Sequence, residues 1–169
     1  MLVAIEPLGR HNRATFSCGV AAIDDWFRHR AGQDERRNVS RIFVAIDDQF
    51  GVIGFYSLSS FTLAIDDLPP ALAKRLPRYG LIPAALVGRL ARDQRLRDKG
   101  VGGLLLADAV HRVLHAARTL AVFAIVVDAK DDSAADFYRR FGFVSFPNNP
   151  HRLFMPLRDA AAALARAQR

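Results

Sequence analysis

The chain has 169 residues, of which 51% are hydrophobic and 24% charged, values typical of a globular domain. This composition excludes a disordered or fibrous protein, and the length suits a single domain, 1–169, whose core needs no cross-links. Lys and Arg number 24 against 17 Asp and Glu, so the net charge of +7 favours a polyanionic partner.

Apolar periodicity and turn residues divide the chain into alternating strands and helices. In the first helix the apolar residues recur at helical spacing, which predicts a core position for Trp26. The expected elements are a strand at 1–7, a helix at 21–30, hairpin strands at 42–46 and 52–63, a short helix between Pro69 and Pro77, a strand at 83–92, a helix at 104–117, a strand at 122–127, a helix at 132–141, strands at 143–146 and 153–156, and a helical, alanine-rich tail at 158–169.

This order of elements predicts the fold class. Buried strands joined through helices imply a parallel section of sheet, and the early hairpin adds an antiparallel section. We therefore expect an α/β (α+β) fold, in which a mixed central sheet carries helices on both faces.

Arginine dominates the positive charge, because only Lys74, Lys99 and Lys130 are lysines. Its planar guanidinium matches phosphate well, although a basic surface alone does not establish nucleic-acid binding.

The one cysteine, Cys18, excludes a disulfide framework and a multi-thiolate zinc site, and we expect it to be half-buried. No apolar run approaches the roughly 20 residues of a membrane span, and residues 1–7 lack the basic start of a secretory leader. We therefore expect a cytoplasmic protein without membrane contact.

A glycine-rich segment, 97–103, joins the strand at 83–92 to the helix that follows. Its three glycines permit close approach of a ligand and positive φ angles, and the amides at the start of a helix attract anions. Arg97 and Lys99 add positive charge. The spacing differs from the dinucleotide fingerprint and from the P-loop. On the residues alone, a pyrophosphate site and an ordinary tight turn both stay open.

A second motif, Phe137-Tyr138 followed by Phe141-Gly142-Phe143, lies in the helix at 132–141 and just after it. Together with Arg97, Gly100 and Gly102, it resembles the GNAT superfamily of acyl-CoA-dependent N-acetyltransferases. The resemblance implies acetyl-CoA as the acyl donor, no metal, and parallel strands that splay to admit pantetheine. The CoA-binding residues that it implies are Leu90, Ala91, Arg92, Arg97, Asp98, Lys99, Gly100, Val101, Gly102, Gly103 and Tyr138.

The resemblance also implies that the hydroxyl of Tyr138 lies beside the thioester sulfur, as the catalytic acid. A phenol with a pKa of about 10 can protonate a leaving thiolate whose thiol has a pKa of about 8.5. The alternative is a packing residue among neighbouring phenylalanines. No Glu or His interrupts the segment 84–91, and we expect Asp93 to be an ion-pair partner of a nearby arginine, so the general base is not identified. An α-amine, with a pKa of about 7.7–8, depends less on such a base than lysine does.

Further segments resemble one branch of the superfamily, the TacT-type acetyltransferase toxins of toxin–antitoxin modules. They include Phe16-Ser17-Cys18-Gly19 and Leu76-Pro77-Arg78-Tyr79, and the likeness covers about residues 5–157. It implies acetylation of the α-amino group of aminoacyl-tRNA, which blocks translation, and inhibition by a ribbon–helix–helix antitoxin. The expected tRNA contacts come from Arg36, Arg37, Lys74, Arg75, Arg78, Arg89, Arg92 and Arg95.

Two alternatives remain open. One is an N-acetyltransferase of the same fold that acts on a small-molecule amine or a protein N-terminus, since fold does not fix substrate. The other is a non-catalytic acyl-CoA-binding or nucleic-acid-binding module, against which the glycine segment and Tyr138 both argue.

His111 and His115 lie four residues apart, but no further metal ligand accompanies them. The preferred aminoacyl-tRNA is undetermined, and the oligomeric state is open, with a homodimer among the alternatives.

Overall fold

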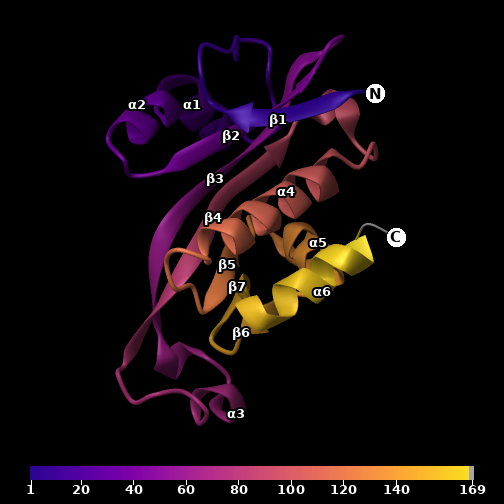
Figure 1. Ribbon diagram of the computed structural model, residues 1–169. Helices are drawn as coiled ribbons and strands as arrows, with labels where there is room; N and C mark the ends of the chain where they lie inside the picture. The colour runs from indigo at the N-terminus through magenta and orange to yellow at the C-terminus, as the bar shows by residue number, and fades with distance from the viewer. Residues whose placement is uncertain (168–169) are drawn as a thin grey trace. The chain divides into compact units, whose positions relative to one another are not determined.

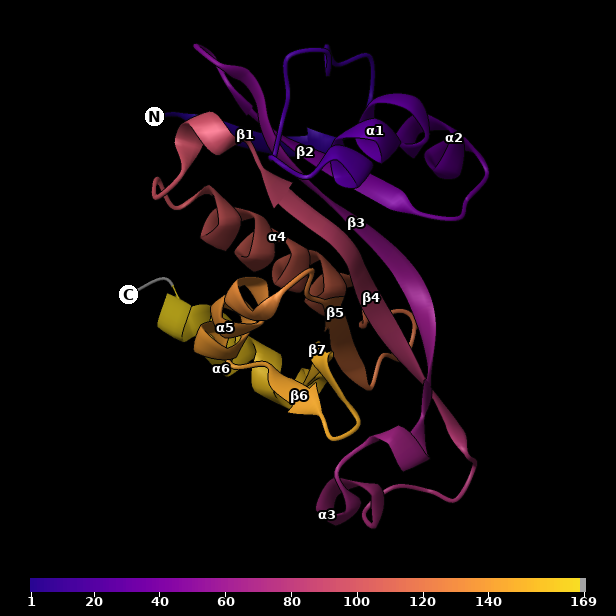
Figure 2. The ribbon, with the colours of Figure 1, turned by 180° about the vertical axis from the view of Figure 1, so that it is seen from behind.

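The computed structural model describes residues 1–167 and divides into two compact units. The N-terminal unit comprises Met1–Ser59 and Gly88–Ala109, and the C-terminal unit comprises Ser60–Val87 and the described part of Val110–Arg169. Figure 1 and Figure 2 show the ribbon from opposite sides.

Within residues 1–167, seven strands are hydrogen-bonded in the order β1-β2-β3-β4-β5-β7-β6. The predicted mixed α/β class is confirmed, since β4 and β5 pair in parallel whereas β1–β2, β2–β3, β5–β7 and β6–β7 pair antiparallel. The strands are β1 (Val3–Pro7), β2 (Arg41–Asp47), β3 (Gly51–Ala64), β4 (Leu81–Arg92), β5 (Ala124–Asp128), β6 (Val144–Phe146) and β7 (Asn149–Pro156). The helices are α1 (Ala21–His29), α2 (Ala31–Arg36), α3 (Pro70–Ala73), α4 (Val101–Ala116), α5 (Asp132–Phe141) and α6 (Leu157–Ala167), with 3₁₀ turns η1 (Ile65–Asp67) and η2 (Gln94–Leu96).

Aromatic rings form the core of the N-terminal unit. Phe27 of α1 stacks on Phe55 of β3 with ring centroids 4.0 Å apart, and Phe16 meets Phe27 edge-on at 5.0 Å. Trp26 is 6% exposed in the same cluster, and Cys18 packs half-buried against it. The core position predicted for Trp26 and the half-buried position predicted for Cys18 are both confirmed.

The second helix, α2, was not predicted. The helical run breaks at Arg30, whose φ of −120° and ψ of −26° leave the helical region. The side chains that follow then tie α2 to its neighbours: the indole N–H of Trp26 donates to Asp34 (3.0 Å), and the amide of Ile42 donates to Glu35 (2.7 Å). Charges that resemble a solvated helix face in the sequence therefore hold α2 to α1 and β2.

In the C-terminal unit both faces of the sheet are covered. Val126 of β5 and Phe154 of β7 lie directly opposite, so they share one face, and Leu72 and Leu76 of the α3 region pack into that cluster. Met155 points to the other face. A side-chain carbon built on Gly142 would lie 3.7 Å from the Met155 sulfur and 3.8 Å from Ala163 of α6. Helices on both faces were predicted, and this unit confirms them.

Several element boundaries differ from the prediction, and two of the starting positions differ by three or more residues. Helix α4 begins at Val101 instead of 104, because Gly102 and Gly103 are accommodated in its first turn. Strand β7 begins at Asn149 instead of 153, since it pairs with β6 around the predicted turn. The predicted helical tail is present as α6, and residues 168–169 of that prediction lie outside the described residues.

Two kinds of feature are absent from residues 1–167. None of the helices described there is long and apolar enough to cross a lipid bilayer. No three His, Cys, Asp or Glu side chains within that range are grouped so as to hold a metal ion.

Gly54 marks the closest approach within the N-terminal unit. A Cβ at this position of β3 would lie 2.8 Å from Leu105 and 3.1 Å from the carbonyl oxygen of Ala91. We therefore expect Gly54→Ala to lower the free energy of unfolding by about 1–3 kcal/mol through overpacking. Denaturant unfolding followed by far-ultraviolet circular dichroism measures this change.

Gly103→Ala is the matched control, because a Cβ there meets no atom within 4 Å. Alanine favours a helix over glycine by about 0.8–1.0 kcal/mol, so this variant should be as stable as the wild type or more so. If Gly54→Ala had the same free energy of unfolding as the wild type, the close approach of Leu105 and Ala91 to this position would be contradicted.

Candidate functional site

The segment after β4 is organised by one buried carboxylate. Asp93 is 1% exposed and accepts hydrogen bonds from the backbone amides of Arg95 (2.9 Å) and Ser17 (3.3 Å). The guanidinium of Arg95 donates twice more to it, at 2.9 Å each. Burial favours a higher pKa for Asp93, but these hydrogen bonds and the charge of Arg95 outweigh burial and lower its pKa. The ion-pair role predicted for Asp93 is confirmed.

Between η2 and α4 the backbone makes a tight, exposed turn. Leu96 and Val101 are buried at its two ends, 4% and 0% exposed, and fix the turn in place. Positive φ angles occur at Asp98 (61°) and Gly100 (79°). The sequence predicts a loop over 97–103, whereas residues 101–103 are helical. Only Gly100 of the three clustered glycines uses a left-handed conformation.

The start of α4 has the features of an anion site. The first hydrogen bond of the helix runs from the Leu104 amide to the Gly100 carbonyl (3.1 Å), so the amides of the preceding first turn point out of the helix end. Arg97 and Lys99 are exposed beside it. A Cβ at Gly100 or Gly103 would meet no atom within 4 Å, which leaves open space above the turn. Free amides, the helix dipole and two cations together fit a phosphate or diphosphate group.

The end of β4 leads directly into this turn. Ala91 is 7% exposed and belongs to the N-terminal core, while Leu90 and Arg92 beside it are half-buried. The amide of Arg89 donates to the Ser57 hydroxyl (3.0 Å), which holds this stretch against β3. All predicted CoA-binding residues except Tyr138 therefore lie on one continuous segment, 90–103, of the N-terminal unit.

Tyr138 belongs to α5 in the C-terminal unit. The helix begins where the Asp131 carboxylate accepts from the Ala134 amide (2.8 Å), and it ends at Gly142 with φ of 120°. Tyr138 is 4% exposed, and its ring meets Phe143 edge-on with centroids 5.8 Å apart. Burial, and then the charge of Asp128, raise the pKa of the phenol, so the hydroxyl keeps its proton at neutral pH.

An ion pair at the end of β5 was not predicted as part of a site. Asp128 is the last residue of β5 and lies directly opposite Arg152 of β7. Arg152 donates from Nε (2.7 Å) and from a terminal nitrogen (3.1 Å) to the two carboxylate oxygens. Its guanidinium also lies 5.0 Å from the centroid of the Phe61 ring. The position of Asp128 at the carboxyl end of a buried parallel strand is the signal that could have indicated it.

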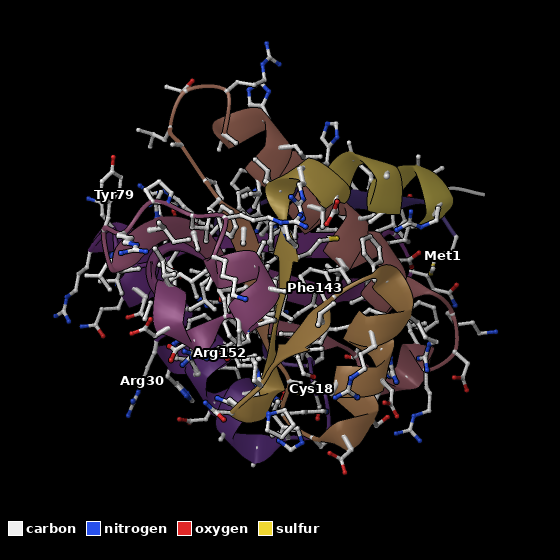
Figure 3. All side chains as sticks on the ribbon, turned by 90° about the horizontal axis from the view of Figure 1, so that it is seen from below. Met1, Cys18, Arg30, Tyr79, Phe143 and Arg152 are labelled. Carbon is white, nitrogen blue, oxygen red and sulfur yellow. The ribbon has the colours of Figure 1, made fainter. Side chains whose placement is uncertain are left out.

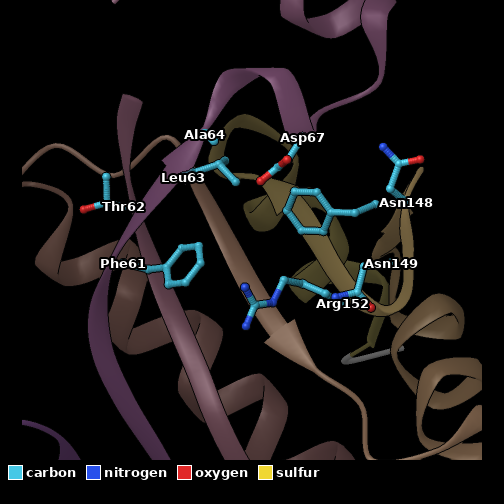
Figure 4. A pocket seen from close by; sticks show the side chains of 9 residues that line it. Phe61, Thr62, Leu63, Ala64, Asp67, Asn148, Asn149 and Arg152 are labelled. Atoms are coloured by element: carbon cyan, nitrogen blue, oxygen red, sulfur yellow. The ribbon is translucent and has the colours of Figure 1, made fainter. Parts of the chain in front are cut away.

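A cavity of about 260 Å³ lies beside Arg152, the basic member of this pair. Arg152 lines it, and Figure 4 shows the guanidinium extending toward Phe61, with Asp67 and Asn148 at the opposite side of the opening. Thr62 and Asn149 complete the polar part of the lining. The cavity therefore combines an aromatic face with hydrogen-bonding groups.

The predicted tRNA contacts of the N-terminal unit divide into two kinds. Arg89 lies over Trp26, with its guanidinium carbon 4.0 Å from the ring centroid, and burial lowers its pKa more than the charge of Asp34 raises it. Arg95 is engaged with the buried Asp93. The other three differ from these: Arg36 and Arg37 are exposed at the end of α2, and Arg92 is half-buried.

In the C-terminal unit the predicted contacts gather on the segment around α3. Lys74, Arg75 and Arg78 are all exposed, and Lys74 and Arg78 line a shallow hollow of about 630 Å³. Tyr79 is 80% exposed beside them and projects outward in Figure 3. Exposed cations with an adjacent aromatic ring are features of surfaces that bind single-stranded nucleic acid.

Comparison with known proteins gives matches over most of the chain. The acetyltransferase (GNAT) domain family matches residues 38–145. A probable toxin TacT from Sinorhizobium fredii (strain NBRC 101917 / NGR234) is 34% identical over 163 residues, which cover 90% of each chain. A tRNA-acetylating toxin from Mycobacterium tuberculosis (strain ATCC 25618 / H37Rv) is 36% identical over 150 residues, which cover 89% of each chain.

Solved structures give the same likeness. AtaT complexed with acetyl-methionyl-tRNAfMet superposes with a TM-score of 0.86 at 26% identity, over 95% of this chain and 98% of that one. AtaTR bound with AcCoA superposes with a TM-score of 0.82 at 25% identity, over 95% and 96% of the two chains.

Two variants of Gly103 test the anion site. Glutamate and glutamine have the same shape, and neither side chain meets a close neighbour at its Cβ, so both variants should fold. We expect Gly103→Glu to weaken acetyl-CoA binding about tenfold more than Gly103→Gln at low salt, because only the carboxylate repels a diphosphate. Calorimetric titration measures both affinities, and the difference should shrink as salt is added. Equal affinities for the two variants would show that the diphosphate does not bind at the start of α4.

Proposed function

Because the chain belongs to the GNAT acetyltransferase family and, within it, to the TacT-type tRNA-acetylating toxins, we propose that it transfers an acetyl group from acetyl-CoA to the α-amino group of aminoacyl-tRNA. Acetylation removes the amine needed for peptide-bond formation, so translation is blocked. The observation that carries this proposal is the 36% identity with a tRNA-acetylating toxin over 89% of both chains.

Acetyl-CoA supplies the activated acetyl thioester. The residues at the start of α4 suit its diphosphate, since Arg97 and Lys99 stand beside outward-pointing amides and open space. We assign the diphosphate to the segment 97–103 and the pantetheine arm to the main chain of Leu90, Ala91 and Arg92. No metal ion enters this assignment.

Tyr138 is the proposed catalytic acid. Its buried hydroxyl has a raised pKa, so it holds a proton at the pH of the cell and does not lose it to solvent. The leaving thiolate of a CoA thioester needs one proton, and a phenol can give it. Packing against Phe143 fixes the ring, which limits the directions in which the hydroxyl can point.

The cations provide the surface for the tRNA. We give priority to Arg36, Arg37 and Arg92 in one unit, and to Lys74, Arg75 and Arg78 in the other, because Arg89 and Arg95 already have partners within the protein. Contacts of this kind reach phosphates and therefore carry affinity more than sequence choice.

The family also suggests the cellular setting. We propose that the chain is a single GNAT domain, 1–169, that acts in the cytoplasm and is held inactive by an antitoxin of the ribbon–helix–helix type. A homodimer is the proposed alternative to a monomer. The antitoxin is proposed from the resemblance to toxins of toxin–antitoxin modules, and the single domain from the length of the chain.

The deciding experiment incubates the purified protein with acetyl-CoA and bulk aminoacylated tRNA. We expect N-acetyl-aminoacyl-tRNA, detected by mass spectrometry after nuclease digestion. The yield should fall steeply with salt, because each phosphate contact releases counterions from the nucleic acid.

Free amino acids, polyamines and a peptide with a free N-terminus serve as competing acceptors in the same assay. Acetylation of one of these with charged tRNA unmodified would replace the toxin assignment by an acetyltransferase for that acceptor.

Tyr138→Phe tests the proposed acid. The change removes one hydroxyl and almost no volume, so the fold and acetyl-CoA binding should persist. We expect kcat for acetyl transfer to fall by about 10²–10⁴-fold, the usual contribution of a general acid. Tyr79→Phe, which alters an exposed tyrosine, is the control for loss of a phenol elsewhere. Full activity in Tyr138→Phe would make Tyr138 a packing residue.

A further inference from the structure

The carboxylate of Asp128 combines a fixed orientation with access for a ligand. Its two oxygens each accept one hydrogen bond from Arg152, whereas a carboxylate has about four acceptor sites. The side chain of Asp128 remains 37% exposed. The Asp128 carboxylate therefore keeps hydrogen-bond acceptor sites that Arg152 does not use and that solvent can reach.

Arg152 is itself held from several directions. The register of β5 and β7 sets it opposite Asp128, and its guanidinium lies over the Phe61 ring at 5.0 Å. Hydrogen bonding to Asp128 raises the pKa of Arg152, and the charge of Asp67 adds to this effect. A carboxylate fixed by such a planar fork on paired strands is preorganised, unlike one on a flexible loop.

The charge of Asp128 also acts on Tyr138 of the same unit. A negative charge that raises the pKa of the phenol makes it a poorer proton donor. This charge is the second cause of the raised pKa of Tyr138, after burial. A cationic group brought by the substrate to Asp128 would offset the remaining negative charge. A fixed carboxylate with unused acceptor sites and access to solvent suits an amine or ammonium ligand, and the charge effect on Tyr138 agrees with this.

We propose that Asp128 is the residue that binds the acceptor amine, accepting a hydrogen bond from its N–H through a carboxylate oxygen. Arg152 is the positioning residue, and the cavity that Arg152 lines receives the rest of the aminoacyl group. This inference rests on the proposed function. The reaction is proton-neutral once the amine is uncharged: the C–N bond forms, the C–S bond breaks, the sulfur takes the proton of Tyr138, and the surplus amine proton restores the phenol. Asp128 orients the amine and stays a carboxylate throughout.

Asp128→Asn is the first test, with rates measured for charged tRNA and for acetyl-CoA separately. We expect kcat/KM for charged tRNA to fall by about 10- to 100-fold, the range for a lost hydrogen bond to a charged group. The KM for acetyl-CoA should be unchanged. The ascending limb of the kcat–pH profile should move to lower pH, because a carboxylate stabilises the ammonium form of the bound amine and an amide does not.

Asp132→Asn is the matched control. Asp132 is another carboxylate of the same unit, paired with His151 at 2.7 Å, and it lies in the first turn of α5. It should leave both kinetic constants and the pH profile at wild-type values. Arg152→Lys keeps the charge but loses the fork, so it should show a smaller fall in kcat/KM for charged tRNA, again without a change for acetyl-CoA.

The outcomes separate the two proposals. A wild-type protein that does not acetylate charged tRNA overturns the proposed function. If the wild type acetylates charged tRNA, two results overturn this inference alone. One is that Asp128→Asn has the same kinetic constants as Asp132→Asn, and the other is that its pH profile does not move. Thermal unfolding monitors the fold of each variant, and if Asp128→Asn does not fold, the split between the two substrates in Arg152→Lys decides.

Discussion

A buried carboxylate must have its hydrogen bonds supplied by its surroundings, and in the N-terminal unit Asp93 imposes this constraint. Its acceptors are satisfied by Arg95 and by the amide of Ser17, while its own amide donates to the carbonyl of Ile53 (2.8 Å). Three segments distant in sequence therefore meet at one residue, two of them through its carboxylate and one through its backbone amide. The direction in which the chain leaves β4 follows from this, and with it the left-handed turn at Asp98 and the outward-pointing end of α4.

In the C-terminal unit the register between β5 and β7 has the corresponding role. Because residues directly opposite share a face, the same alignment that buries Val126 against Phe154 brings Asp128 to Arg152 two residues further on. A slip of one residue would reverse the faces and lose both the apolar layer and the ion pair. Stability and chemistry in this unit thus depend on one alignment of two strands.

Features that depend on short-range patterns were predictable from the sequence, and features that depend on long-range pairing were not. Helix α5, its glycine stop and the glycine-rich turn were all apparent, because caps and turns are local. The contact of Asp128 with Arg152 spans 24 positions and needs the strand register. The stacking of Arg89 on Trp26 likewise joins β4 to α1. The end of α1 was predicted to within one residue, whereas α2 was missed because its charged residues resemble the solvated face of a helix.

The surroundings of Trp26 also determine what the intrinsic fluorescence of the protein can report. It is the one tryptophan of the chain, and it lies in the N-terminal unit beneath a guanidinium, with its indole N–H bound to Asp34. Its emission therefore follows the packing of that unit, whereas a backbone signal such as ellipticity averages over helices of both. Superimposable melting curves from the two probes would mean that the units unfold as one cooperative body, and separated curves would give each unit its own stability.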